Sequence, residues 1–91
     1  MKWVEIIQLR SLGETRRALL VELKKMAASM GDHPGGLSLE IYSHTALKSD
    51  FVIIVSGESE EVGLPQNTPG VHLAYLLKEF GLVNCSLWLE A

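Results

Sequence analysis

Features typical of membrane, secreted and nucleic-acid-binding proteins are scarce in this sequence. No apolar run approaches the roughly 20 residues of a membrane-spanning helix. Cys85 is the one cysteine, so no disulfide can form within the chain, and a reducing cytoplasm is the expected location. The 11 acidic residues outnumber the 8 basic ones, and the net charge of −3 argues against nucleic acid as the main ligand. We therefore expect a cytoplasmic protein with neither a membrane nor nucleic acid among its partners.

Short motifs for metal or phosphate chemistry are missing as well. The histidines His33, His44 and His72 have no zinc-ligand spacing, and no calcium-binding EF-hand pattern is present. Neither a glycine-rich phosphate loop nor a nucleophile elbow appears. We predict no metal site and no cofactor. Cys85 alternates with apolar neighbours along a predicted strand, so we expect a core thiol in preference to a nucleophile.

The length and the apolar content together suggest a chain that needs a partner. Its 91 residues fit a single domain, residues 1–91, that hides only roughly 60–65% of its unfolded surface. Hydrophobic residues nevertheless make up 47% of the chain. This content predicts that some apolar surface is kept for another chain.

Two periodicities of apolar residues predict the order of the elements. Alternating or continuous apolar runs predict strands over residues 3–10, 37–44, 49–57 and 83–90. Offsets of three and four predict helices over residues 15–30 and 69–80, the second with Pro69 at its first position. With right-handed crossovers, the order βαββαβ predicts a ferredoxin-like α+β fold. It has a four-stranded antiparallel sheet, two helices on one face, and the first and third strands in the centre.

The strand over residues 49–57 is apolar without a break from position 51 to 55, which indicates burial on both faces of the sheet. On the first strand, either Val4 and Ile6 or the odd-numbered residues face the helices. The second choice buries Glu5, which is costly without a partner, so we predict that Val4 and Ile6 face the helices. The helix-free face then carries the four residues that we expect to line a ligand site: Trp3, Glu5, Tyr42 and Trp88.

An aromatic and apolar face of this kind needs a cover, and a second copy of the sheet is the most economical one. Two stretches, "GLSLEIYSHTALKSDFVIIVSGES" (36–59) and "TPGVHLAYLLKEFG" (68–81), resemble the dimeric α/β-barrel superfamily and, within it, the antibiotic-biosynthesis-monooxygenase-like domains. The resemblance implies a ferredoxin-like fold and a homodimer; members include cofactor-independent oxygenases and haem-degrading enzymes. Gly57 stands where members often carry Trp, and residues 63–67 lack their His, so the resemblance transfers no catalytic residue.

Two functions remain open from the sequence. The protein either binds a small apolar or aromatic molecule in a cavity on the helix-free face, with monooxygenase-like chemistry, or is a structural or regulatory dimerisation module. In the first case Glu5 is the candidate general acid or base, and in the second its carboxylate is hydrogen-bonded across the interface. Glu40, Tyr42 and His44 share a strand face and form either a proton-transfer group or a solvated outer strand. A cavity of roughly 300 Å³ or more with convergent polar groups distinguishes the two functions.

Overall fold

A computed structural model describes residues 2–12, 16–31, 37–58 and 69–91, so His33 and residues 63–67 lie outside the described residues. The elements are β1 (Lys2–Ser11), α1 (Arg16–Gly31), β2 (Ser38–Ser43), β3 (Asp50–Glu58), α2 (Pro69–Leu77), the 3₁₀ turn η3 (Lys78–Phe80) and β4 (Gly81–Leu89). Their order is the predicted one, and each element lies within a few residues of its predicted bounds. In the described part of the chain, no helix has the length and apolarity needed to cross a bilayer.

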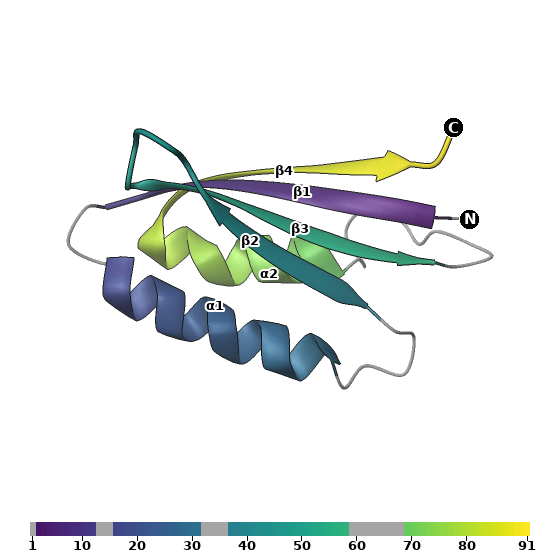
Figure 1. Cartoon of the computed structure of the whole chain (residues 1–91), viewed down its shortest axis with the longest axis horizontal. Helices are drawn as coiled ribbons and strands as arrows, with labels where there is room; N and C mark the ends of the chain where they lie inside the picture. Colours follow the sequence, from purple (N-terminus) through teal and green to yellow (C-terminus); the bar gives the residue numbers. More distant parts are fainter. Residues whose placement is uncertain (1, 13–15, 32–36, 59–68) are drawn as a thin grey trace.

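The four strands form one antiparallel sheet in the order β2-β3-β1-β4, with β1 and β3 in the centre. Both helices cover the same face of this sheet (Figure 1). Helix α1 packs against β2, while α2 packs against β1 and β4. The structure therefore confirms the predicted ferredoxin-like α+β fold, and among the described residues no helix lies on the opposite face of the sheet (Figure 1), which we call the helix-free face.

The core lies between the sheet and the two helices. Leu19 and Leu23 of α1 and Leu73 and Leu77 of α2 are buried there, as the spacing of three and four residues predicts. The sheet contributes the remaining large apolar side chains of the core: Trp3, Ile7, Leu9, Phe51, Ile53 and Val55.

The prediction for the two faces of β1 is wrong. The odd-numbered side chains face the helices, and Glu5 among them is 0% exposed, whereas Val4 and Ile6 lie half-buried on the helix-free face. The reason is a partner that the sequence does not reveal: the backbone N–H of Gly70, in the first turn of α2, donates to Oε1 of Glu5 at 2.9 Å. The first N–H groups of a helix have no partner within the helix and carry partial positive charge, so they compensate a buried carboxylate.

Two glycines allow the side chains of β1 to approach other elements closely. A Cβ atom added to Gly70 would lie 2.4 Å from both Cδ and Oε2 of Glu5. A Cβ atom added to Gly57 would lie 2.7 Å from Cζ2 of Trp3, which is its direct partner across β1 and β3. The Trp3 ring thus covers Gly57. Gly57 stands where the monooxygenase-like domains that the sequence resembles often carry a tryptophan.

Candidate functional site

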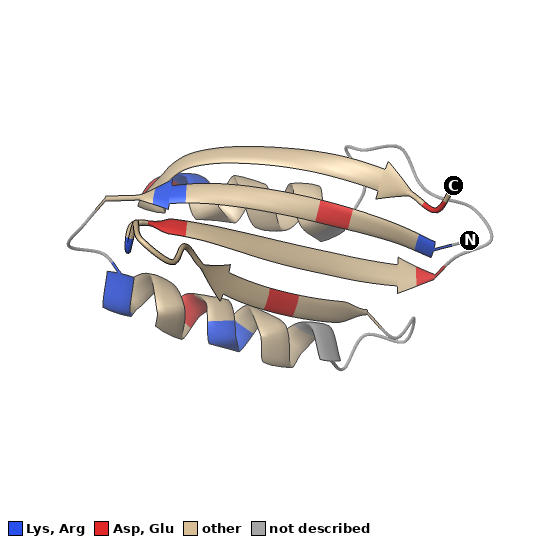
Figure 2. Cartoon of the chain, turned by 45° about the horizontal axis from the view of Figure 1, so that its top comes forward, with Lys and Arg blue, Asp and Glu red and all other residues tan. Residues whose placement is uncertain are grey.

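The strand register sets the side chains of the helix-free face in rows, which we divide into two halves. The half that we name apolar contains Val4 paired with Trp88 and Ile6 paired with Ile54, and its rows also carry Ser38, Glu40, Ser56 and Ser86. The polar half contains two rows of side chains, one formed by Tyr42, Val52, Gln8 and Asn84 and the other by His44, Asp50, Arg10 and Leu82. In the central strands β1 and β3, charged residues lie near the strand ends, except for the acidic residue within β1 (Figure 2).

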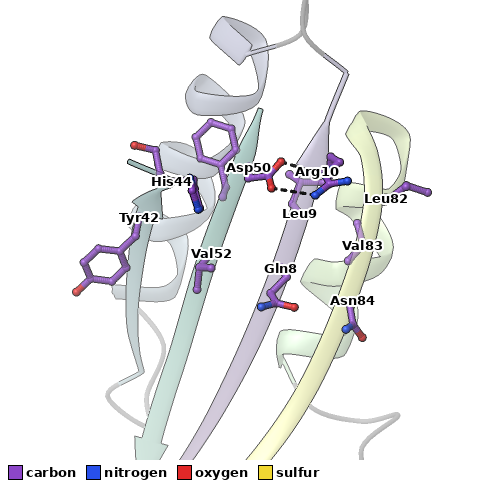
Figure 3. A pocket seen from close by; sticks show the side chains of 12 residues that line it. Gln8, Leu9, Arg10, Tyr42, His44, Asp50, Val52, Leu82, Val83 and Asn84 are labelled. Atoms are coloured by element: carbon purple, nitrogen blue, oxygen red, sulfur yellow. Dashed lines mark hydrogen bonds and ion pairs between the residues drawn. The ribbon is translucent and has the colours of Figure 1, made fainter. Parts of the chain in front are cut away.

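The surface of the polar half is hollowed. The hollow has a volume of about 440 Å³ and is lined by side chains or backbone of both polar rows together with Leu9, Ser43, Phe51 and Val83. Arg10, Asp50 and His44 lie beside one another across β1, β3 and the end of β2, and Tyr42 lies at the β2 edge (Figure 3). The volume exceeds the roughly 300 Å³ that a small-molecule site needs. We name this feature the polar hollow.

Arg10 and Asp50, the two central residues of the second row, form an ion pair. Nε of Arg10 donates to Oδ1 of Asp50 at 3.2 Å, and Nη2 donates to Oδ2 at 3.4 Å. The hydroxyl of Ser49 also donates to Oδ1, at 3.0 Å. The hydrogen bonds from Arg10 lower the pKa of Asp50, against the opposing effect of partial burial. Asp50 is thus an ionised, oriented carboxylate at neutral pH.

The hydrogen bonds of His44 leave its Nε2–H free to donate to a group in the hollow. Its Nδ1 accepts the backbone N–H groups of Ala46 and Leu47, each at 3.0 Å. A neutral imidazole that accepts at Nδ1 carries its proton on Nε2. The turn after β2 therefore fixes the tautomer in which Nε2 donates.

Tyr42 is paired with an acid on its own strand. Its hydroxyl donates to Oε2 of Glu40, two positions earlier on the same face of β2. This hydrogen bond and the negative charge of Glu40 raise the pKa of Tyr42 above its ordinary value. The structure thus brings Glu40 and Tyr42 together, and it places Tyr42 and His44, but not Glu40, in the lining of the polar hollow.

The four predicted ligand-binding residues do not share one space. Tyr42 and Trp88 lie on the helix-free face, as predicted, but Trp88 is in the apolar half, 58% exposed, with its indole N–H bonded to Ser86 at 2.8 Å. Trp3 and Glu5 lie on the opposite face under the helices, so the prediction that they join Tyr42 and Trp88 is wrong. Their placement follows from the bond between Glu5 and the first turn of α2.

Beneath α2, Glu5 has a neighbour in Cys85 on β4. Burial, and after it the negative charge of Glu5, raises the pKa of the Cys85 thiol. The thiol is half-buried and faces the core, in agreement with the sequence pattern. Among the described residues, no group of three His, Cys, Asp or Glu side chains could hold a metal ion.

The sequence does not single out Gln8, Arg10, Asp50 or Asn84 as site residues. One signal was available: among the even-numbered residues of β1, Val4 and Ile6 are apolar, whereas Gln8 and Arg10 are polar. The partners of these residues on β3 and β4 follow from register, which the sequence does not fix.

Comparisons with known proteins bear on the fold. No protein-family model and no curated protein matches the sequence. Among solved structures, the chain is similar to Rv0793 from Mycobacterium tuberculosis, with a TM-score of 0.74 and 15% identity over 100% of this chain and 96% of that one. It is also similar to PA3566 from Pseudomonas aeruginosa, with a TM-score of 0.73 and 16% identity over 99% of this chain and 94% of that one.

A further similar structure is that of a conserved protein of unknown function from Bacteroides thetaiotaomicron, described as a possible oxidoreductase. Its TM-score is 0.73 and its identity 11%, over 96% of this chain and 95% of that one. At such identities the likeness establishes the fold alone. The chain thus has a ferredoxin-like fold that recurs over nearly the full length of proteins from three bacteria.

Proposed function

We propose that this protein is a cytoplasmic homodimer that binds a small apolar or aromatic molecule in the polar hollow, with a second copy covering the helix-free face. The observation that carries the proposal is the hollow itself. It combines a volume of about 440 Å³ with converging polar side chains, on the face opposite to the one that α1 and α2 cover (Figure 1). Ligand sites in proteins have this combination of size and a few oriented polar groups.

The apolar half supports the homodimer. Trp88 is 58% exposed there, beside Val4, in a chain of only 91 residues. Burying on the order of 1,000 Å² of apolar surface per dimer contributes about 25 kcal/mol gross. The loss of motional freedom and polar desolvation offset much of this gain.

We further propose that the protein carries out monooxygenase-like chemistry on the bound molecule. It is supported by the resemblance of residues 36–59 and 68–81 to that family and by the description of the Bacteroides protein as a possible oxidoreductase. Within the hollow, the Nε2–H of His44 is suited to donate to an oxygen atom of a substrate. The phenol of Tyr42 donates its proton to Glu40, so its oxygen is left as an acceptor for a substrate hydroxyl. The alternative is a structural or regulatory dimer, which the apolar half alone would favour.

The assembly is tested by light scattering at low micromolar concentration. A homodimer has twice the chain mass of 10.0 kDa. A monomer at that concentration would overturn the proposed assembly.

Ligand binding is tested by a thermal-shift screen of small aromatic compounds with a blocked variant. Val52→Trp fills the hollow from β3, and Val21→Trp places the same residue on the exposed surface of α1 as a control. A ligand at 100 times its Kd stabilises by about 2.7 kcal/mol, which raises the Tm by roughly 10 °C or more in a chain this small. This shift should persist in Val21→Trp and vanish in Val52→Trp. Compounds that act equally on both variants bind elsewhere, and a screen without hits favours the structural dimer.

A further inference from the structure

We infer that the polar hollow selects a planar aromatic ligand bearing one carboxylate, which Arg10 binds. The inference rests on the proposed function, since it names the ligand class of the same site. It is carried by the hydrogen-bonding groups that the hollow offers and by the charge beside them.

Arg10 has donors left after its ion pair is made. A guanidinium has five N–H donors, and the bonds to Asp50 use one on Nε and one on Nη2. Within the described part of the chain the guanidinium of Arg10 has no other hydrogen-bond partner, so three of its N–H groups remain. The side chain is 66% exposed, and these groups are open to an incoming ligand.

More of the hydrogen-bond acceptors in the hollow than of its donors already have a partner. Oδ1 of Asp50 accepts from Arg10 and from Ser49, and Oδ2 accepts from Arg10. His44 uses Nδ1 on the backbone of its turn, which leaves Nε2–H as a donor. Gln8 and Asn84 each add two N–H donors and one acceptor. The hollow therefore presents more donors than acceptors.

When a second copy covers the face, the excess of hydrogen-bond donors in the hollow favours some ligands over others. Donors that leave water without finding an acceptor cost free energy, and the cost is larger for a charged group. Apolar side chains alone cannot fill the hollow of a closed dimer, because they would leave the Arg10 donors unpaired. An occupant that brings oxygen atoms pairs these donors, and among organic groups a carboxylate matches the planar guanidinium best.

The charge of Asp50 and the apolar side chains that line the hollow further restrict the class of ligand. Asp50 already places one negative charge against Arg10, so a ligand with a single charge is favoured over a dianion such as a phosphate monoester. Val52 and Leu82 stand in the same two rows and offer apolar contacts for a flat ring. An aromatic monocarboxylate satisfies both conditions.

The direct test titrates the protein with benzoate, benzamide and benzylamine while amide shifts are followed by NMR. We expect benzoate to shift the amides of Arg10, Asp50 and Leu82 in a saturable way. Benzamide, of the same shape but without charge, should bind about ten-fold more weakly, and benzylamine, a cation at neutral pH, more weakly still. Equal binding of benzoate and benzamide at these amides overturns the inference but leaves the proposed function standing. If none of the three probes nor any screened aromatic compound shifts these amides, the proposed function fails as well.

Removing the charge of Arg10 and removing that of Asp50 should change the affinity for benzoate in opposite directions. Arg10→Gln should weaken benzoate binding about ten-fold, whereas Asp50→Asn, which removes the competing carboxylate, should strengthen it several-fold. Arg17→Gln removes the same charge from the exposed surface of α1, on the opposite face of the sheet (Figure 1), and should leave the Kd unchanged. A purely structural role of the ion pair would weaken binding in both Arg10→Gln and Asp50→Asn, and that result overturns the inference. If Arg10→Gln fails to fold, the sign of the Asp50→Asn effect decides.

Discussion

Replacing Gly70 by alanine should destabilise the protein, although helix propensity predicts the reverse. Gly70 is the second residue of α2, and its N–H binds the buried carboxylate of Glu5. The added Cβ atom would lie 2.4 Å from Cδ and Oε2 of Glu5, where ordinary contact begins at 3.4 Å. Glu5 is enclosed by the core, so its carboxylate can move away from the added methyl group only by rearranging within a packed space, and otherwise α2 or β1 must shift.

The magnitude follows from three contributions. Inserting a methyl group into a packed core costs about 1–3 kcal/mol. Weakening a hydrogen bond to a charged group costs about 1.5–3 kcal/mol. The higher helix propensity of alanine offsets at most about 1 kcal/mol of this. The free energy of unfolding should therefore fall by about 1.5–6 kcal/mol, which lowers the Tm by roughly 6 °C or more in a chain of this size.

The assay is urea unfolding at one fixed protein concentration, followed by far-UV circular dichroism and by tryptophan fluorescence. Ala28→Gly, at an exposed position of α1, should lose about 0.5–1 kcal/mol and shows the ordinary sign of the propensity effect. In a Glu5→Ala background the clash is removed, so Gly70→Ala should become neutral or slightly stabilising. A neutral or stabilising effect of Gly70→Ala in the wild-type background would refute the reasoning.

Two further predictions concern ionisable groups on the helix-free face. Because Arg10 lowers the folded-state pKa of Asp50, the pair contributes stability above the ordinary aspartate pKa and loses it as the pH falls through the lowered value. In denaturant titrations Arg10→Gln should thus be less stable than wild type at pH 7, and this difference should shrink as the pH falls below the ordinary aspartate pKa; a constant difference contradicts this. Glu40→Gln should lower the pKa of Tyr42 toward its ordinary value in an ultraviolet titration made in a Tyr75→Phe background; an unchanged pKa would show that Glu40 does not act on the phenol in solution.

Local patterns in the sequence determine the elements and their order. Residue spacing and Pro69 locate both helices because a helix depends on contacts three and four residues apart. The alternating strands place Tyr42 and Trp88 on the helix-free face for a similar reason, since neighbouring side chains of a strand point to opposite sides. From these elements and right-handed crossovers, the ferredoxin-like fold follows.

Only the tertiary structure decides which face of β1 is buried and which residues form the hollow. The apolar pattern of β1 allows both orientations, and the choice depends on a hydrogen bond from Gly70, which is 65 residues away from Glu5. In the hollow, Arg10 and Asp50 are 40 residues apart, and their pairing depends on the register of β1 and β3. A slip of one residue would turn either side chain to the opposite face. Both features result from contacts between distant segments, which local periodicity does not encode.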